Sequence, residues 1–324
     1  MFMKQKRKFS KGLILIIAAL LILTISVFFS KNAFAELSSI WTMAFRELPF
    51  IATPAKCPSD MVWVDAGKFC IDKYEASQDT EAGNVFMVDI NGDGDFEGTV
   101  DVYGDGTTFD ETTPTYRAKS EYGAKPWVNI NQVNAKAACM AAGKHLATNY
   151  EMLLAAKGMP DPDTSDPADD SEPCNIWYSD NDVADDLPSG AVEAGCAYAG
   201  DPDQSCHQTG TATLCVSDAG AYDLIGNVWE WTDNVINGGL HPVTGIALPA
   251  QNRITGLDVY GIPNSTGSAT LDYNYDYFWI NADGYRGFIR GGGWAYGSNA
   301  GLFALALSFA PSLTSGSIGF RCAR

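Results

Sequence analysis

The final stretch of the chain, Arg290–Arg324, reads RGGGWAYGSNAGLFALALSFAPSLTSGSIGFRCAR. Apolar residues stand between glycines and small polar residues, a pattern typical of short strands joined by exposed loops. Two kinds of position alternate in it. The positions typical of a fixed framework are Arg290, Trp294, Leu302, Pro311, Ile318, Gly319, Phe320, Arg321 and Cys322. The positions typical of exposed filler are Ala295, Tyr296, Ala306, Ser308, Phe309, Leu313, Ser315, Gly316 and Ser317.

This segment resembles the end of sulfatase-modifying-factor domains, a family that includes the formylglycine-generating enzyme. Those domains begin the segment with Arg-Gly-Gly-x-Trp, here Arg290–Trp294, and end it with Gly-Phe-Arg-Cys, here Gly319–Cys322. The resemblance extends to the motif GNVWEW at Gly226–Trp231 and to Cys139–Glu151, and it covers nearly everything after Cys57. It implies an α+β, C-type-lectin-like fold of the formylglycine-generating-enzyme type. Such a fold has short twisted antiparallel sheets, two core helices and long loops stapled by disulfides.

Within this fold, the final segment is most similar to the C-terminal variable region of proteins diversified by retroelements. There, Asn-rich template positions are rewritten through mutated adenines. AAY codons then give NNY codons, which cannot encode Lys, Glu, Gln, Met or Trp, and no filler position carries any of these five. The resemblance implies a ligand-binding face of Ala295, Tyr296, Ala306, Ser308, Phe309, Leu313, Ser315 and Ser317. Its partner would be a protein or a glycan on another cell or particle.

The residues themselves predict several elements. Met61–Val64 and Phe69–Tyr74 alternate like two strands around a turn. Asn131–Gly143 has the N-cap, apolar spacing and terminal glycine of a helix, and a second helix is expected at Asn149–Lys157. Pro160–Cys215 lacks periodicity and is interpreted as a long loop held by disulfides.

The chain begins with a targeting segment at residues 1–35. Lysines and one arginine precede the apolar run Leu13–Ser30, and Ala33–Ala35 fits a small-x-small cleavage site. Two interpretations remain: a cleaved signal peptide, or an uncleaved anchor, because the apolar run is long for a signal. Both export the rest of the chain, secreted or surface-held, so that it meets a membrane only through this segment. A linker at residues 36–56 and one domain at residues 57–324 follow.

The chain is acidic and contains eight cysteines. Its formal net charge is −18, and residues 1–35 contribute six positive charges and no negative one, so the exported part is near −24. This charge disfavours nucleic acid, whose phosphates bind Lys and Arg. An even number of cysteines in an exported chain indicates disulfides. Local spacing favours Cys57–Cys70 and Cys196–Cys206, the resemblance implies Cys139–Cys322, and Cys174–Cys215 would remain.

The stretch Asp89–Asp101, DINGDGDFEGTVD, predicts a calcium loop. Oxygen ligands stand at the first, third, fifth and seventh positions of such a loop, here Asp89, Asn91, Asp93 and Asp95, with a glycine at the sixth. Val100 stands where these loops have a bidentate Glu, and a second, looser acidic run continues to Glu111. The alternative is a solvated acidic insertion without a metal.

The GNVWEW motif implies a second calcium site by resemblance to the formylglycine-generating enzyme. The ion would be held by the side chains of Asp223 and Glu230 and by the carbonyl groups of Gly226 and Val228. Hard oxygen donors at this spacing suit calcium. The alternative is that the tryptophans are core residues and Glu230 caps a turn.

Aromatic residues gather upstream of the final segment. Tyr260–Tyr285 includes Tyr273, Tyr275, Tyr277, Phe278 and Trp279. A strand of this kind forms core, a carbohydrate platform or part of a protein-binding face.

The absence of certain residues favours a binding protein over an enzyme. The formylglycine-generating enzyme needs two cysteines in the final segment to bind copper and substrate, and Gly291–Phe320 contains none. A thiolate mechanism cannot run without a thiol. Related iron enzymes use three histidines, and His145, His207 and His241 lack the required spacing. The sequence thus predicts a ligand-binding protein without catalytic residues, copper or iron. The alternatives are a family enzyme of unknown reaction and a structural envelope protein.

Overall fold

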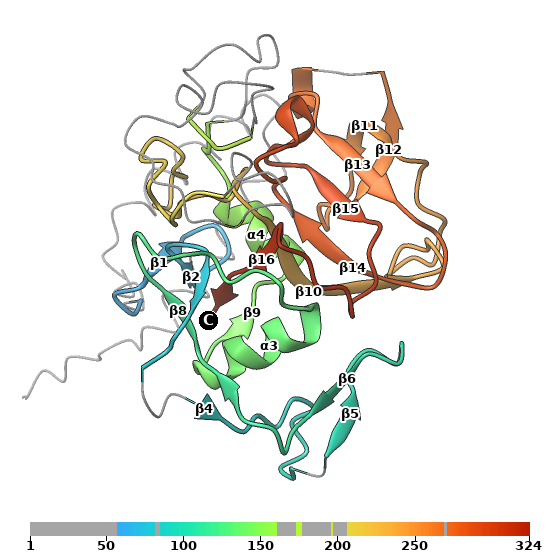
Figure 1. The fold of residues 1–324 in the computed structure, drawn as a ribbon. Helices are drawn as coiled ribbons and strands as arrows, with labels where there is room; N and C mark the ends of the chain where they lie inside the picture. The colour runs from blue at the N-terminus through green and yellow to red at the C-terminus, as the bar shows by residue number, and fades with distance from the viewer. Residues whose placement is uncertain are drawn as a thin grey trace, which may run out of the picture. The chain divides into compact units, whose positions relative to one another are not determined.

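The computed structural model describes residues 57–81, 85–96, 98–160, 173–176, 196, 206–268 and 271–324. The expected targeting segment and linker, and most of the loop Pro160–Cys215, lie outside the described residues. In the described part, the fold is α+β, with two α-helices beside a seven-stranded sheet, a four-stranded sheet and three two-stranded sheets (Figure 1).

The seven-stranded sheet has the order β12-β11-β13-β15-β14-β10-β16. Its strands are β10 (Trp229–Asn237), β11 (Asn252–Leu257), β12 (Pro263–Gly267), β13 (Tyr277–Ile280), β14 (Tyr285–Arg290), β15 (Leu305–Leu307) and β16 (Ile318–Phe320). The sheet is mixed, and not wholly antiparallel as expected, because β16 runs parallel to β10 and β15 runs parallel to β13. Parallel neighbours require a long connection, and here other strands of the sheet lie within it: β14 comes between β13 and β15 in the chain, and β11–β15 come between β10 and β16.

The four-stranded sheet joins the two ends of the domain. Its order is β1 (Met61–Val64), β2 (Phe69–Asp72), β17 (Cys322–Ala323) and β9 (His145–Leu146). The predicted first hairpin is therefore confirmed, and Lys68 closes its turn with a φ of 59°. One residue, Arg321, separates β16 from β17, so the chain passes from the large sheet to the small one at this point.

Both predicted helices are present. Helix α3 (Gln132–Ala141) begins after Asn131, whose side chain accepts a hydrogen bond from the Asn134 N–H. Gly143 follows its end with a φ of 69°. Helix α4 (Asn149–Ala155) begins with a capping box between Thr148 and Glu151, which satisfies two N–H groups that the helix leaves unpaired. Two short 3₁₀ turns, η2 (Leu271–Tyr273) and η3 (Gly297–Asn299), complete the helical elements of the described residues.

Three hairpin-like pairs come from the segment between β2 and α3. They are β3 (Ala76–Gln78) with β8 (Ala118–Ser120), β4 (Val85–Phe86) with β7 (Thr115–Tyr116), and β5 (Thr99–Asp101) with β6 (Thr108–Asp110). The acidic stretch is thus a structured insertion. Its apolar residues Val88, Ile90 and Phe109 pack against Val133 and Ala137 of α3.

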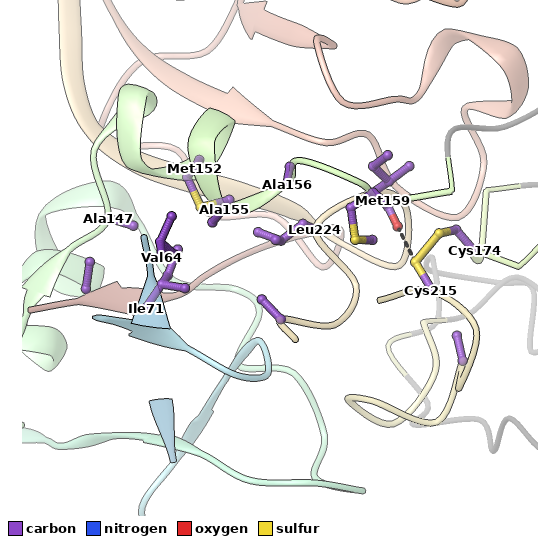
Figure 2. Close-up of a cluster of buried hydrophobic side chains, with 14 of the residues drawn as sticks. Val64, Ile71, Ala147, Met152, Ala155, Ala156, Met159, Cys174, Cys215 and Leu224 are labelled. Atoms are coloured by element: carbon purple, nitrogen blue, oxygen red, sulfur yellow. Dashed lines mark hydrogen bonds between the residues drawn. A yellow bond between two sulfur atoms is a disulfide. The ribbon is translucent and has the colours of Figure 1, made fainter. Parts of the chain in front are cut away.

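Disulfides and apolar clusters hold these sheets together. The bonds are Cys57–Cys70, Cys139–Cys322, Cys174–Cys215 and Cys196–Cys206, the pairing expected from the sequence. Figure 2 shows one cluster, in which Val64 and Ile71 lie near Met152 of α4, with the Cys174–Cys215 bond at its other end. The bond Cys139–Cys322 ties α3 to β17. The C-terminal segment is therefore fixed at its last strand.

Candidate binding face

One face of the large sheet carries a row of side chains from five neighbouring strands. Trp279 pairs with Ala306, Ala306 with Ile289, Ile289 with Trp231, and Trp231 with Phe320. Paired residues of adjacent strands present their side chains to the same face. Apart from Trp279, which is partly buried, all of them are buried in one apolar cluster that also contains residues of α3.

The predicted binding face is wrong at Ala306. It was expected to face solvent, and its exposed fraction is 3%. The physical reason is its position in the middle of β15, which has a neighbouring strand on each side. Its side chain shares a face with Trp279, which belongs to the border of the same cluster.

Aromatic rings gather next to Ala306. The Tyr296 ring stands edge-on to Trp229, with 4.9 Å between ring centroids, and to Trp279, with 5.6 Å. Tyr277 lies 4.7 Å from Trp279, and the guanidinium carbon of Arg253 lies 5.7 Å from the Tyr277 ring centre. The predicted aromatic stretch Tyr260–Tyr285 therefore contributes both to the core and to the surface. Phe278 is a core residue, while Tyr277 and Trp279 are partly exposed beside the final segment.

The other predicted face residues differ in exposure. Ala295 is exposed and Phe309 is 37% exposed, while Tyr296, Ser308, Leu313, Ser315 and Ser317 are half-buried. The framework residues Trp294, Ile318 and Phe320 are buried, as expected. Tyr296, Ala306 and Leu313 all contact the same apolar cluster, and the hydroxyl groups of Ser315 and Ser317 lie 2.9 Å apart. The structure brings these residues together around the aromatic rings, with Ala295 and Phe309 in the flanking loops.

A cleft next to this segment was missed by the sequence analysis. It has a volume of about 440 Å³, and its lining includes Ser77, Gln78, Glu121, Lys125, Trp127 and Asn129. Asn129, with a φ of 58°, donates its backbone N–H to the Ser315 carbonyl at 2.8 Å. Trp127 contacts Phe320, with 5.6 Å between ring centroids. The cleft therefore borders the final segment, and the only sequence signal for it is the polar run after the family's Trp127.

A buried cluster of charged side chains holds the end of the final segment, at Arg321, against β10. Arg321 donates both Nε and Nη2 to the Glu230 carboxylate, at 2.5 to 3.0 Å, and Nη2 also to the Tyr222 carbonyl at 2.9 Å. Burial raises the pKa of Asp223 to about 7. Burial, with the charges of Asp223 and Glu230, raises the pKa of Glu75 well above its usual value. One guanidinium among three buried carboxyl groups leaves an excess of negative charge, so the pKa shifts favour protonated carboxyl groups.

At the predicted calcium site of the GNVWEW motif, the structure places a protein cation beside the carboxylate. In the GNVWEW motif both carboxylate oxygens of Glu230 accept from Arg321, and Asp223 accepts from the Gly210 N–H at 2.6 Å. Arg321 is thus the cation already in contact with Glu230, and an ion there would have to share that carboxylate. Among the described residues, no three His, Cys, Asp or Glu side chains form a ready metal site. Calcium beside Glu230 stays a prediction.

Two solved structures are similar to parts of this chain. The Major Tropism Determinant P3c Variant is similar at 16% sequence identity with a TM-score of 0.35, over 82% of this chain and 52% of that one. PvdO from Pseudomonas aeruginosa is similar at 18% identity with a TM-score of 0.36, over 79% of this chain and 80% of that one. The chain spans about half the length of the tropism determinant.

No curated protein matches the chain. A model of the Sulfatase-modifying factor enzyme 1-like domain matches residues 50–324, and the chain therefore belongs to that family.

Proposed function

We propose that this domain binds ligands through its C-terminal segment and does not catalyse the family's oxidation. The observation that carries the proposal is the division within the final segment. Trp294, Ile318 and Phe320 are buried, while Ala295 and Phe309 stand exposed beside half-buried aromatic rings. A fold tolerates rewriting where side chains do not pack, because changes in the core cost several kcal/mol. The segment therefore combines a fixed frame with positions that are free to vary.

The aromatic rings suit the centre of such a binding face. Tyrosine and tryptophan offer large contact areas at a small cost in side-chain entropy, and they are enriched at binding hot spots. Tyr277 and Trp279 lie outside the filler positions and are thus constant anchors beside Tyr296. The ligand is a protein or a glycan on another cell or particle, reached by a secreted or surface-anchored chain. Four disulfides suit an oxidising compartment of this kind.

Sequencing of the C-terminal segment in many cells of one population tests the proposed diversification. Substitutions should concentrate at the filler positions, carry NNY codons and leave Trp294 and Phe320 unchanged. The neighbouring DNA should contain a reverse transcriptase and an Asn-rich near-copy of the segment. Substitutions spread evenly over framework and filler positions would overturn the proposal.

We expect no oxidase activity, because the final segment has no cysteine that is free to react. All eight cysteines of the chain are paired in disulfides, and Cys322, the only one in the final segment, is bonded to Cys139. A copper-supplemented assay on a Cys-x-Pro-x-Arg peptide should give no aldehyde, while a competent formylglycine-generating enzyme run alongside gives product. Aldehyde above the blank would favour the alternative, a family enzyme.

A further inference from the structure

Two acidic loops of the insertion have the same hydrogen-bond pattern. The Asp89 carboxylate accepts from the N–H groups of Gly92–Gly94, at 2.6, 3.2 and 2.8 Å. The Asp101 carboxylate accepts from those of Gly104–Gly106, at 2.9, 3.2 and 2.9 Å. The backbone is therefore folded in the same way in both loops, which allows their side chains to be compared position by position.

The third position distinguishes the loops. In the first loop it is Asn91, whose side chain lies against Asp93, with 2.6 Å between Nδ2 and Oδ2. In the second loop it is Tyr103, whose hydroxyl donates to Asp233 at 3.0 Å. The first loop thus keeps compact oxygen-bearing side chains at its first, third and fifth positions, as calcium loops do. The second loop does not, because its third side chain is used elsewhere.

A buried carboxylate outside the loops lies at the entrance of the first. Glu111 is fully buried. Its Oε1 accepts from the N–H of Ile90, the second residue of the first loop, at 2.8 Å, while its Oε2 has no hydrogen-bond partner among the residues that the structure describes. A buried carboxylate oxygen without a partner is costly, and a bound cation would remove that cost. This oxygen is evidence for a ligand that does not depend on the loop's own geometry.

The β5–β6 hairpin explains how Glu111 reaches the first loop. Val100 and Phe109 are paired across this hairpin, and the Glu111 N–H donates to the Gly98 carbonyl at 3.0 Å. Glu111 therefore returns to the residues that directly follow the first loop. Calcium loops close with a bidentate Glu at position 12, where this chain has Val100. A carboxylate from across the hairpin, Glu111, thus reaches the backbone of the first loop, although Asp89, Asp93 and Glu111 do not yet converge on one point and an ion would have to draw them together.

We infer that the first loop binds one Ca²⁺ ion, with Glu111 as the closing ligand. The other donors are the side chains of Asp89, Asn91 and Asp93 and the carbonyl of Asp95, an all-oxygen set that suits a hard cation. The ion takes over the hydrogen bond between Asn91 and Asp93. It fixes the insertion where Ile90 packs against α3, and so stabilises a part of the domain remote from the binding face.

Calorimetric titration of the full chain with CaCl₂, after treatment with a chelator, tests this inference. The wild type should bind calcium and melt at a higher temperature with calcium than with EDTA. Glu111→Gln and Asp93→Asn should each weaken binding by roughly tenfold or more, since ligand-supporting groups alone are worth that much. Melting of both variants in EDTA, close to that of the wild type, shows that they fold.

Asp105→Asn is the matched control, because Asp105 occupies in the second loop the place of Asp93 in the first. Asp105→Asn and Asp223→Asn should both leave the calcium affinity of the first loop unchanged, and an ion at the predicted Asp223–Glu230 site would appear as a separate binding event. Equal affinity in the wild type and Glu111→Gln would overturn the inference, and so would a calcium effect lost only in Asp223→Asn or an absence of binding at millimolar calcium.

Discussion

Arg321 shows how one residue supports the whole C-terminal segment. It is fully buried between β16 and β17, and its guanidinium contacts Glu230 of β10 and the carbonyls of Asp72 and Tyr222. Removing one partner of a buried ion pair leaves an uncompensated charge, typically at a cost of about 3–5 kcal/mol. The Gly-Phe-Arg-Cys motif therefore has a structural role, because its buried arginine connects the two sheets.

His207 gives the domain a predicted acid sensitivity. Burial lowers the pKa of its imidazole from 6.5 to about 4, and its Nδ1 has no hydrogen-bond partner within the described part of the chain. Between these two pH values the unfolded state binds the proton and the folded state does not. The contribution of His207 to stability is therefore present above pH 6.5, falls as the pH is lowered, and levels off below about pH 4.

The variant His207→Gln should remove this dependence. From pH 7.5 to pH 5, the wild type should lose roughly 2 kcal/mol of unfolding free energy relative to the variant, since each unit of pKa shift corresponds to about 1.4 kcal/mol. Urea unfolding of both proteins at the two pH values measures the difference. If both lose stability in parallel, the imidazole is already accessible to protons in the folded state.

Elements with local signals could be predicted, and those set by distant pairing could not. The first hairpin and both helices follow from alternation, caps and glycines within a few residues of each element. The parallel pairing of β16 with β10 joins Ile318 to Trp229, far apart in sequence, and leaves no local pattern. The hairpin that carries Glu111 to the first acidic loop is local, but its short strands, Thr99–Asp101 and Thr108–Asp110, lie in an acidic, Gly-rich run without clear strand alternation.

The Cys139–Cys322 bond should stabilise the arrangement of helices and sheets more than the other disulfides do. It closes a separation of 183 residues, whereas Cys57–Cys70 closes 13. In the chain-entropy model these loops correspond to roughly 5 and 3 kcal/mol. Denaturant unfolding of Cys139→Ala/Cys322→Ala and of Cys57→Ala/Cys70→Ala compares them directly. Equal losses would show that strain or local packing, and not the unfolded chain, decides the contribution of each bond.

The candidate site was only partly accessible to sequence reasoning, because exposure depends on the whole molecule. A framework of large apolar residues is easy to recognise, and Trp294 and Phe320 are buried as expected. Small residues carry no such signal. Ala306 and Ala295 look alike in sequence, yet one is buried in a central strand and the other is exposed in a loop. The cleft beside Ser315 needs the segment around Asn129, which only the fold brings near.

The filler positions should consequently fall into two classes when they are changed. Five lie away from the central cluster or meet it only by small polar groups: Ala295, Ser308, Phe309, Ser315 and Ser317. Combined replacement by Ser at Ala295 and Phe309 and by Ala at the three serines should leave the melting temperature nearly unchanged. Exposed side chains contribute little, and removal of both hydroxyls of a hydrogen-bonded pair is close to neutral.

Tyr296 and Ala306 should behave in the opposite way. Tyr296→Ser removes a ring packed against Trp229 and Trp279, at an expected cost of about 2 kcal/mol. Ala306→Leu adds volume beneath Trp279 and should cost about 1–3 kcal/mol, while Ala306→Ser should be milder. Thermal melting of the single variants measures both effects. A display library randomised at all eight face positions extends the test: folded members should accept any residue at Ala295 and only small ones at position 306. Free variation at position 306 would mean that β15 bends to admit large side chains, and that the face is larger than the exposed residues indicate.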